Sequence, residues 1–344
     1  MKNTIINNKK RLWQGIPGLE KTENGRIFVT WFSGGDKEPH SENKIYICYS
    51  DNKSETFTEP ALIVDPSGKN RAFDPNLWID SDNKLWLIYN RGNKENAEHG
   101  IYARICVNPD KSILDWDEEF LIDLDVPFNF RLNKPIVLSS GSWIMPVTYA
   151  TEPTYGWFAN QKQLQGVAIS TDKGQSWTLH GELKAPHWAL ENMIVELNDG
   201  RLWMLIRTGD GFLWESFSSD GGKTWSSASP SNISNPGSRF FIRRLNSGDL
   251  LLVNHYKYTG RSHLTAQIST DEGKTWNEGL LLDEREGVSY PDGVQDNNGK
   301  IWIVYDRDRK GAGEILLATF HEEDVIAGEN KSGDVNLKQI VNKL

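Results

Sequence analysis

A tyrosine, a glutamate and several arginines stand where strand-like segments of the chain begin or end. They are Glu191, Arg207, Arg261, Tyr290 and Arg307. Tyrosine and glutamate serve in nucleophilic and acid–base catalysis. The planar guanidinium of arginine pairs with a carboxylate through two parallel hydrogen bonds, which the ammonium of lysine does not form. These residues are the first candidates for a site that takes an acidic molecule.

An eight-residue phrase repeats along the chain and indicates the elements that position these residues. Its full copies are Ser170–Trp177, Ser218–Trp225 and Ser269–Trp276, and Ser50–Phe57 is a degenerate fourth copy. The full copies are about 50 residues apart, a period typical of propellers and solenoids. The aspartate of the phrase suits a tight turn, the glycine permits positive φ, and the tryptophan is an anchor to bury between repeats. The phrase therefore predicts a structural turn and says nothing about catalysis.

Strand-like runs and the near absence of helical periodicity predict an all-β fold. Each propeller blade is a four-stranded antiparallel sheet, and the chain accommodates six. We predict one six-bladed β-propeller domain over residues 1–344, with blades at roughly 12–65, 70–125, 133–183, 190–230, 238–283 and 288–322. The last blade lacks a fourth strand, so we expect the segment around Thr4–Ile6 to supply it and close the ring.

Ligands of propellers usually bind at the mouth of the central channel, so residues near the inner strands are further candidates. The cations are Arg71, Lys134, Arg239 and Arg307. Asp74, which precedes Pro75, is expected at the channel mouth, although its place also suits a turn. The aromatic segment 155–158 is either a platform on which a sugar stacks or a lid packed on the third blade.

Composition and charge disfavour several classes of partner and cofactor. The formal net charge is −9 and the isoelectric point is about 5.4, which disfavours nucleic acid and anionic membranes. Cys48 and Cys106 lie in apolar runs and are expected to be buried free thiols. No metal-ligand spacing or phosphate loop is present, so we expect no metal and no cofactor. Without a long apolar run or a signal-peptide core, the chain reads as cytoplasmic, unless a leader has been removed.

The repeated phrase resembles the Asp-box, or BNR repeat, of the sialidase superfamily. Exo-sialidases are six-bladed Asp-box propellers that hold a sugar carboxylate with three arginines and use a tyrosine nucleophile partnered by a glutamate. The resemblance implies that Tyr290 is the nucleophile and Glu191 its partner, and that Arg207 and Arg261 bind the carboxylate. A phenol suits this role because an anionic sugar repels a carboxylate nucleophile. The implied activity is exo-hydrolysis of a terminal acidic sugar.

The first blade departs from this pattern. Sialidases carry an Arg-Ile-Pro phrase whose arginine belongs to the clamp, and the corresponding phrase here is Gly15–Pro17. The acid/base aspartate of the family should lie in the loop 34–43, where a gapless count back from the strand 44–50 arrives at His40. The candidates for the acid in this loop are Asp36, Glu38, Glu42 and His40.

A closer resemblance is to the sialidase-like BNR group, many members of which carry Asp-Pro, Lys-Pro and Ser-Tyr-Pro-Asp in blades two, three and six. The matching residues here are Asp74–Pro75, Lys134–Pro135 and Ser289–Asp292. Membership of that group does not name the substrate.

Three functions stay open. The first is the exo-glycosidase just described. The second is a polysaccharide lyase, in which arginines neutralise a uronate carboxylate and Tyr290 or His40 moves the proton. The third is a propeller that binds a glycan or a protein without catalysis, which the altered first blade favours. The expected partner is an acidic carbohydrate in the first two, and the oligomeric state stays open.

Overall fold

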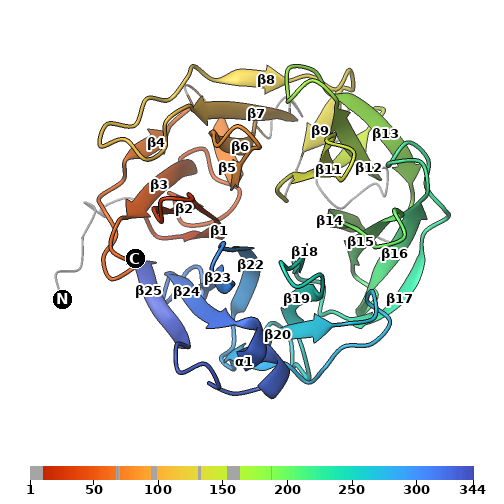
Figure 1. Ribbon diagram of the computed structural model, residues 1–344. Helices are drawn as coiled ribbons and strands as arrows, with labels where there is room; N and C mark the ends of the chain where they lie inside the picture. Colours follow the sequence, from red (N-terminus) through yellow and green to blue (C-terminus); the bar gives the residue numbers. More distant parts are fainter. Residues whose placement is uncertain are drawn as a thin grey trace.

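Six antiparallel sheets stand around a common axis in the computed structural model (Figure 1). The structure describes residues 11–66, 68, 70–93, 99–130, 133–152, 163–186 and 188–344. Strands β1, β5, β14, β18 and β22 lie nearest the centre of the ring, and later strands of each sheet lie toward the rim (Figure 1). The predicted all-β, six-bladed β-propeller is confirmed.

Each blade takes its strands in chain order from the axis outward. The first blade holds β1 (Gln14–Lys21), β2 (Ile27–Ser33), β3 (Lys44–Ser50) and β4 (Leu62–Val64). The second holds β5 (Arg71–Ile79), β6 (Leu85–Gly92), β7 (His99–Cys106) and β8 (Phe120–Ile122). The third holds β10 (Ile136–Val137), β11 (Trp143–Ala150), β12 (Leu164–Ser170) and β13 (Thr178–Leu183), and β9 (Phe128–Phe130) pairs with β11 as an additional strand.

The other three blades follow the same order. The fourth holds β14 (Ala189–Glu196), β15 (Leu202–Thr208), β16 (Phe212–Ser218) and β17 (Ser229–Ser234). The fifth holds β18 (Phe241–Arg244), β19 (Leu250–His255), β20 (Leu264–Ser269) and β21 (Leu280–Asp283). The sixth holds β22 (Val288–Gln295), β23 (Lys300–Arg307), β24 (Glu314–His321) and β25 (Asn336–Lys343), with helix α1 (Glu322–Ala327) before its last strand.

The pattern of apolar residues in a strand changes with its distance from the axis. Neighbouring blades cover both faces of the inner strands but leave the outer strands partly exposed. Strand β2 reads Ile-Phe-Val-Thr-Trp-Phe-Ser and is buried throughout. A strand covered by neighbouring blades on both faces needs apolar residues on both. Strand β16, one place farther out, alternates between buried and partly exposed side chains, and β17 at the rim is mostly exposed. The continuous apolar runs therefore mark the inner strands.

The repeated phrase forms the same hydrogen-bonded turn at each full copy. In the first copy, the Asp172 carboxylate accepts the Ser176 backbone amide at 2.9 Å and the Ser176 hydroxyl at 2.5 Å. The Ser170 hydroxyl accepts the Gly174 amide at 2.8 Å, and Gly174 has φ 82°. A Cβ at Gly174 would stand 2.7 Å from the Trp86 ring of the second blade. The glycine therefore serves both the turn and the close contact between blades.

The prediction that residues 4–6 supply the fourth strand of the last blade is wrong. Strand β25 pairs with β24 over Glu314↔Lys343 to Thr319↔Asn336, and residues 1–10 lie outside the described residues. The physical reason is local: a chain that leaves β24 returns after one short helix to the free edge of the same sheet.

The ring closes instead through buried carboxylates of the sixth blade that accept backbone amides of β1. Asp306 accepts the Ile16 amide at 2.6 Å, and Asp292 accepts the Leu19 amide at 2.9 Å. Both aspartates are almost fully buried. Apolar residues of the two blades, including Leu19 and Trp302, pack in one cluster beside them. The hydrogen bonds offset the free-energy cost of burying these carboxylates.

Cys48 and Cys106 are buried and free, as predicted. Among the residues that the structure describes, no helix is long and apolar enough to cross a membrane.

Candidate functional site

Four innermost strands carry a bulge at which a residue other than glycine has positive φ. These residues are Ile16 (58°), Asp74 (49°), Glu191 (54°) and Tyr290 (57°). The register shifts at each of them, in β1, β5, β14 and β22. A bulge re-aims a side chain, and positive φ in such residues is uncommon and clusters at functional sites. The fold therefore turns Asp74, Glu191 and Tyr290 toward the same end of the channel, which we call the channel mouth.

Tyr290, Glu191 and Arg207 form a closed hydrogen-bonded triangle across the channel. The Tyr290 hydroxyl donates to Glu191 Oε1 at 2.6 Å. Arg207 Nη1 donates to Glu191 Oε2 at 2.6 Å and to the Tyr290 oxygen at 2.9 Å. All three residues are buried. The hydrogen bond between Tyr290 and Glu191 therefore links the sixth blade to the fourth. These are the two residues to which the sialidase resemblance assigns nucleophilic chemistry.

Charges around this triangle set the protonation of its members. Burial raises the pKa of Tyr290 to about 12, against the opposing effect of Arg207. Burial alone would also raise the pKa of Glu191, but Arg207 and Arg239 hold it below its ordinary value. The glutamate is therefore ionised and the phenol protonated at neutral pH. An ionised carboxylate that accepts a hydrogen bond from a phenol has the geometry that general-base chemistry requires.

Four guanidinium groups surround the Tyr290 ring. Their Cζ atoms lie 4.2 to 5.7 Å from the ring centre and belong to Arg309 (4.2 Å), Arg261 (5.6 Å), Arg207 (5.7 Å) and Arg239 (5.7 Å). A carboxylate that approaches the ring would meet several of these donors. The arrangement is suited to an anionic ligand.

A second group of ionisable side chains stands beside these arginines. The Glu38 carboxylate, 26% exposed, lies 3.8 Å from Arg71 Nη1 and 4.0 Å from Arg309 Nη1. Burial raises the pKa of Glu38, although both arginines oppose this shift. Burial and the nearby Glu38 charge raise the pKa of Asp74 to about 8. At neutral pH Asp74 is therefore mostly protonated, and the pKa of Glu38 lies above its ordinary value.

The structure separates the four acid candidates of the loop 34–43. It places Glu38 beside Arg309, whereas Asp36 is exposed. The ring of His40 lies against Gly35, and its Nδ1 accepts the Glu42 amide at 3.0 Å. No described contact links His40 or Glu42 to Tyr290. A gapless count misses Glu38 because this loop folds around Asn43, whose side-chain amide donates to the Gly34 carbonyl at 2.8 Å.

The candidate cations occupy different depths of the channel. The Lys134 ammonium donates to the carbonyls of Leu19 and Gly293 at 2.6 and 3.0 Å and lies 3.1 Å from Asp292. The ammonium also lies 3.7 Å from Glu20, so Lys134 ties three blades together inside the channel. Arg307 pairs with Glu314 at 2.9 Å. No described contact joins Lys134 or Arg307 to Tyr290.

Arg239, whose Cζ lies 5.7 Å from the centre of the Tyr290 ring, is fully buried. Its Nε and Nη2 donate to the side-chain carbonyls of Asn133 and Asn76 at 2.6 and 3.1 Å. This cation is fixed by neutral partners, and its charge therefore acts on Glu191 and Asp74. Arg71 is also buried and lies over the Phe73 ring at 3.6 Å.

Arg309 is the site residue that sequence reasoning missed. It follows β23, two positions after Arg307, in the charged segment Asp306–Arg309. Its Nε donates to Asp306 at 2.9 Å and its Nη2 to the Ser289 hydroxyl at 3.3 Å. No local pattern pointed to Arg309, because it lies in the turn after β23, where Asp308 has a positive φ of 45° and the strand alternation has ended. The aromatic segment 155–158 lies outside the described residues.

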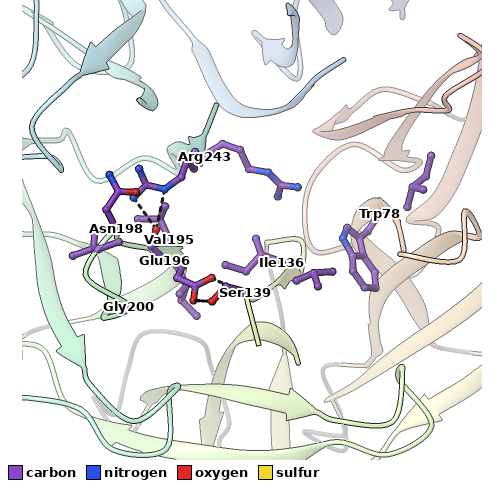
Figure 2. A pocket seen from close by; sticks show the side chains of 13 residues that line it. Trp78, Ile136, Ser139, Val195, Glu196, Asn198, Gly200 and Arg243 are labelled. Atoms are coloured by element: carbon purple, nitrogen blue, oxygen red, sulfur yellow. Dashed lines mark hydrogen bonds between the residues drawn. The ribbon is translucent and has the colours of Figure 1, made fainter. Parts of the chain in front are cut away.

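The opposite end of the channel holds a pocket of about 540 Å³ with another character (Figure 2). Trp78, Ile136 and Val195 contribute to its lining. The Glu196 carboxylate there accepts the Ser139 amide and hydroxyl at 2.7 and 2.6 Å (Figure 2). The Glu196 carboxylate and the nearby Arg244 are both hydrogen-bonded to other residues of the protein. The catalytic candidates lie at the channel mouth. Among the described residues, no group of His, Cys, Asp or Glu side chains is arranged to hold a metal ion.

Comparisons with known proteins agree with this architecture. The family model described as BNR repeat-like domain matches residues 25–303. A Hadza microbial sialidase, Hz136, superposes with a TM-score of 0.75 at 18% identity, over 91% of this chain and 66% of that one. The chain thus spans just under two thirds of that protein. No curated protein matches the sequence.

Two further solved structures resemble the fold over nearly their whole lengths. The intramolecular trans-sialidase from Ruminococcus gnavus gives a TM-score of 0.72 at 14% identity, covering 94% of this chain and 98% of that one. A protein of unknown function from Dyadobacter fermentans gives 0.71 at 17% identity, covering 92% and 96%. At these identities the similarity establishes the fold alone.

Proposed function

We propose that this chain, which belongs to the BNR repeat-like domain family, is an exo-acting glycoside hydrolase that removes a terminal acidic sugar. The carrying observation is the hydrogen bond of 2.6 Å between the Tyr290 hydroxyl and an ionised Glu191, with four arginines around the tyrosine ring. This combination places a nucleophile, its base and a cluster of positive charges at one point of the fold.

In the proposed reaction, the Tyr290 oxygen attacks the anomeric carbon while Glu191 takes the phenol proton. The bond from the anomeric carbon to the leaving oxygen breaks, and Glu38 gives its proton to that oxygen. The raised pKa of Glu38 supports this role, since a general acid must be protonated near the working pH. Water then attacks the anomeric carbon of the glycosyl–tyrosine intermediate while Glu38 takes a proton from that water. The bond from the anomeric carbon to the Tyr290 oxygen breaks, and Glu191 returns the proton to the phenol. Two displacements retain the anomeric configuration.

The positive charge around Tyr290 has two consequences for this reaction. Arg207 and Arg261 would bind the sugar carboxylate, which directs an acidic sugar to the ring face. The same charges stabilise the developing phenolate, whose pKa in the free protein is about 12. An anionic sugar repels a carboxylate nucleophile, so a neutral phenol with a buried base is the better nucleophile here.

The test is a paired assay of the wild-type protein and Tyr290→Phe with 4-methylumbelliferyl sialoside and a mixture of acidic oligosaccharides. Products are identified by mass. We expect the wild type to release a hydrated acidic sugar and the variant to lose roughly a thousandfold or more of kcat. A product lighter by one water would replace hydrolysis with elimination. Binding without any product would leave a glycan-binding propeller as the function.

A further inference from the structure

Arg309 and Gly15 come from the two blades that close the ring and meet at the channel mouth. A Cβ added at Gly15 would stand 2.8 Å from Cδ and Nε of Arg309 and 2.9 Å from its Cγ. Real Cβ atoms do not approach other heavy atoms so closely, so the absence of a side chain at Gly15 is what gives the Arg309 stem its path. Gly15 has no positive φ in the structure. Close approach, and not backbone conformation, therefore explains this glycine.

The Arg309 guanidinium is held on its inner side and open on its outer side. Its Nε donates to Asp306, which is fully buried and also accepts the Ile16 amide at 2.6 Å. Nη2 donates to Ser289, the neighbour of Tyr290, at 3.3 Å. Nη1 has Glu38 at 4.0 Å, beyond a hydrogen bond, and the side chain is 18% exposed. Preorganised donors with hydrogens left over are what a ligand carboxylate requires.

Arg261, the other outward-facing arginine, is also incompletely paired. Its Nη2 donates to the Gly237 carbonyl at 3.2 Å, and its Cζ lies 5.6 Å from the Tyr290 ring centre. Arg309 is close enough to contribute to lowering the pKa of Arg261, after the larger effect of burial. Two like charges held around one ring repel each other. An anion that binds both would remove this repulsion.

We propose that Arg309 binds the carboxylate of the substrate together with Arg261, and that Gly15 is the residue that admits it. The pair makes Arg309 a specificity-determining residue that selects acids over their neutral esters. This inference rests on the proposed function only for the identity of the ligand as an acidic sugar. The geometry assigns the carboxylate to the outer side of Arg309.

The experiment compares the wild type with Arg309→Ala, Gly15→Ala and the double variant Gly15→Arg/Arg309→Ala. The matched control is Lys310→Ala, which removes an exposed cation from the next position. Each protein is assayed with 4-methylumbelliferyl sialoside and with its methyl ester. Binding of free N-acetylneuraminic acid is measured by calorimetry.

For Arg309→Ala we expect KM for the acid to rise roughly 10- to 100-fold, the usual effect of losing a charge-assisted hydrogen bond. KM for the ester should change less than about threefold, because an ester offers no charge to this arginine. Gly15→Ala should also raise KM for the acid more than KM for the ester, because the added methyl group displaces the Arg309 side chain. The double variant should regain part of the selectivity, because an arginine side chain starting at position 15 enters the same space. Lys310→Ala should match the wild type.

The outcomes separate this inference from the proposed function. If the wild type turns over substrate and the ratio of KM for the acid to KM for the ester is the same in Arg309→Ala, the role of Arg309 is overturned. The proposed hydrolysis is then unaffected. An equal loss for acid and ester would show a structural role and overturns it too. If the wild type binds the acid without turnover and Arg309→Ala does not bind it, the role of Arg309 is supported and the proposed hydrolysis is overturned. A wild type that neither binds nor converts the acid overturns both.

Discussion

Strand β14 carries one glutamate near its start, Glu191, and another at its last position, Glu196, and the two carboxylates have different surroundings. Glu191 at the channel mouth is buried and accepts hydrogen bonds from Tyr290 and Arg207, two groups that come from other strands. Glu196 at the far end accepts the amide and hydroxyl of Ser139, a single neighbouring turn residue. One carboxylate therefore joins a tyrosine and an arginine at the channel mouth, and the other fixes a turn.

The arginines at the two ends differ in the same way. Arg244 at the far end makes two hydrogen bonds to Glu272, at 2.9 and 2.8 Å, and two to the Glu196 carbonyl. Arg261 at the mouth has one hydrogen bond to a carbonyl, at 3.2 Å. A cation whose donors are already matched stabilises the fold, whereas one left with free donors is available to a ligand. The contrast teaches that pairing, more than residue type, distinguishes the arginines fixed within this propeller from those that we propose bind a ligand.

The largest expected effect comes from the two ends of β14. Glu191→Gln removes the base for Tyr290 and should lower kcat by roughly 10²- to 10⁴-fold. Glu196→Gln keeps the hydrogen-bonding shape at the far end and should leave kcat unchanged. Both are measured by steady-state kinetics on the sialoside.

Because Glu191→Gln also leaves buried Arg207 without its counter-charge, circular dichroism and the Tm of the variant are recorded alongside. A folded Glu191→Gln protein with wild-type kcat would contradict the assignment of Glu191 as the base. Equal losses in the two variants would mean that the difference between the two ends is not functional.

The arginine pair gives the next effect in size. Arg261→Ala should raise KM for the acidic substrate roughly 10- to 100-fold, with little change in the free energy of unfolding. Arg244→Ala should do the reverse, losing about 1 kcal/mol of stability because its pair is partly exposed, with KM unchanged. Urea unfolding and kinetics on both variants provide the measurement. A stability loss in Arg261→Ala equal to that in Arg244→Ala would remove the distinction.

The last prediction concerns the pH dependence of stability, and it compares Asp74 within β5 with Asp80 just after that strand. The pKa of Asp74 is raised to about 8 in the folded protein, by burial first and then by Glu38. Its contribution to stability is therefore full below the unfolded pKa, near 4, and is lost as pH rises toward 8. Asp74→Asn carries no such group, so it should lose less Tm than the wild type between pH 5 and pH 8.5.

The comparison for Asp74 is Asp80, which follows the far end of the same strand. Asp80 accepts the amides of Asp82 and Lys84 at 2.8 and 3.0 Å and the Trp86 indole at 2.7 Å. Asp80→Asn should therefore lower stability by about 1–3 kcal/mol, while Asp74→Asn at pH 8.5 should raise it. Thermal unfolding in two buffers checks both signs. Parallel Tm–pH profiles for wild type and Asp74→Asn would contradict the raised pKa.

Much of the fold was predictable because its determinants are local. The Asp-box turn needs a serine, an aspartate and a glycine within a few residues, and each full copy forms the same hydrogen bonds. The inner strands were visible as continuous apolar runs. The last strand was missed because β25 is polar and only half-buried, so its pattern is weak. Nothing local distinguishes an edge strand with that composition from a tail.

The site was predictable only in part. Tyr290, Glu191, Arg207 and Arg261 were found through motifs, and the structure brings their side chains together. Glu38 could not be separated from its loop neighbours, because its position depends on how the loop folds around Asn43. Lys134 looked like a ligand-binding cation, but its partners Leu19, Gly293 and Asp292 come from distant parts of the chain.

The sequence by itself determined the turns, the blade period and the residue types at each strand end, because these depend on interactions within a few residues. Only the tertiary structure decided which charges are paired. Arg309 stands over Tyr290 because Gly15, almost three hundred positions earlier, leaves it room and Asp306 holds it. Closing a ring brings together residues from its first and last blades, and electrostatic pairing depends on distance in space, which no local pattern encodes.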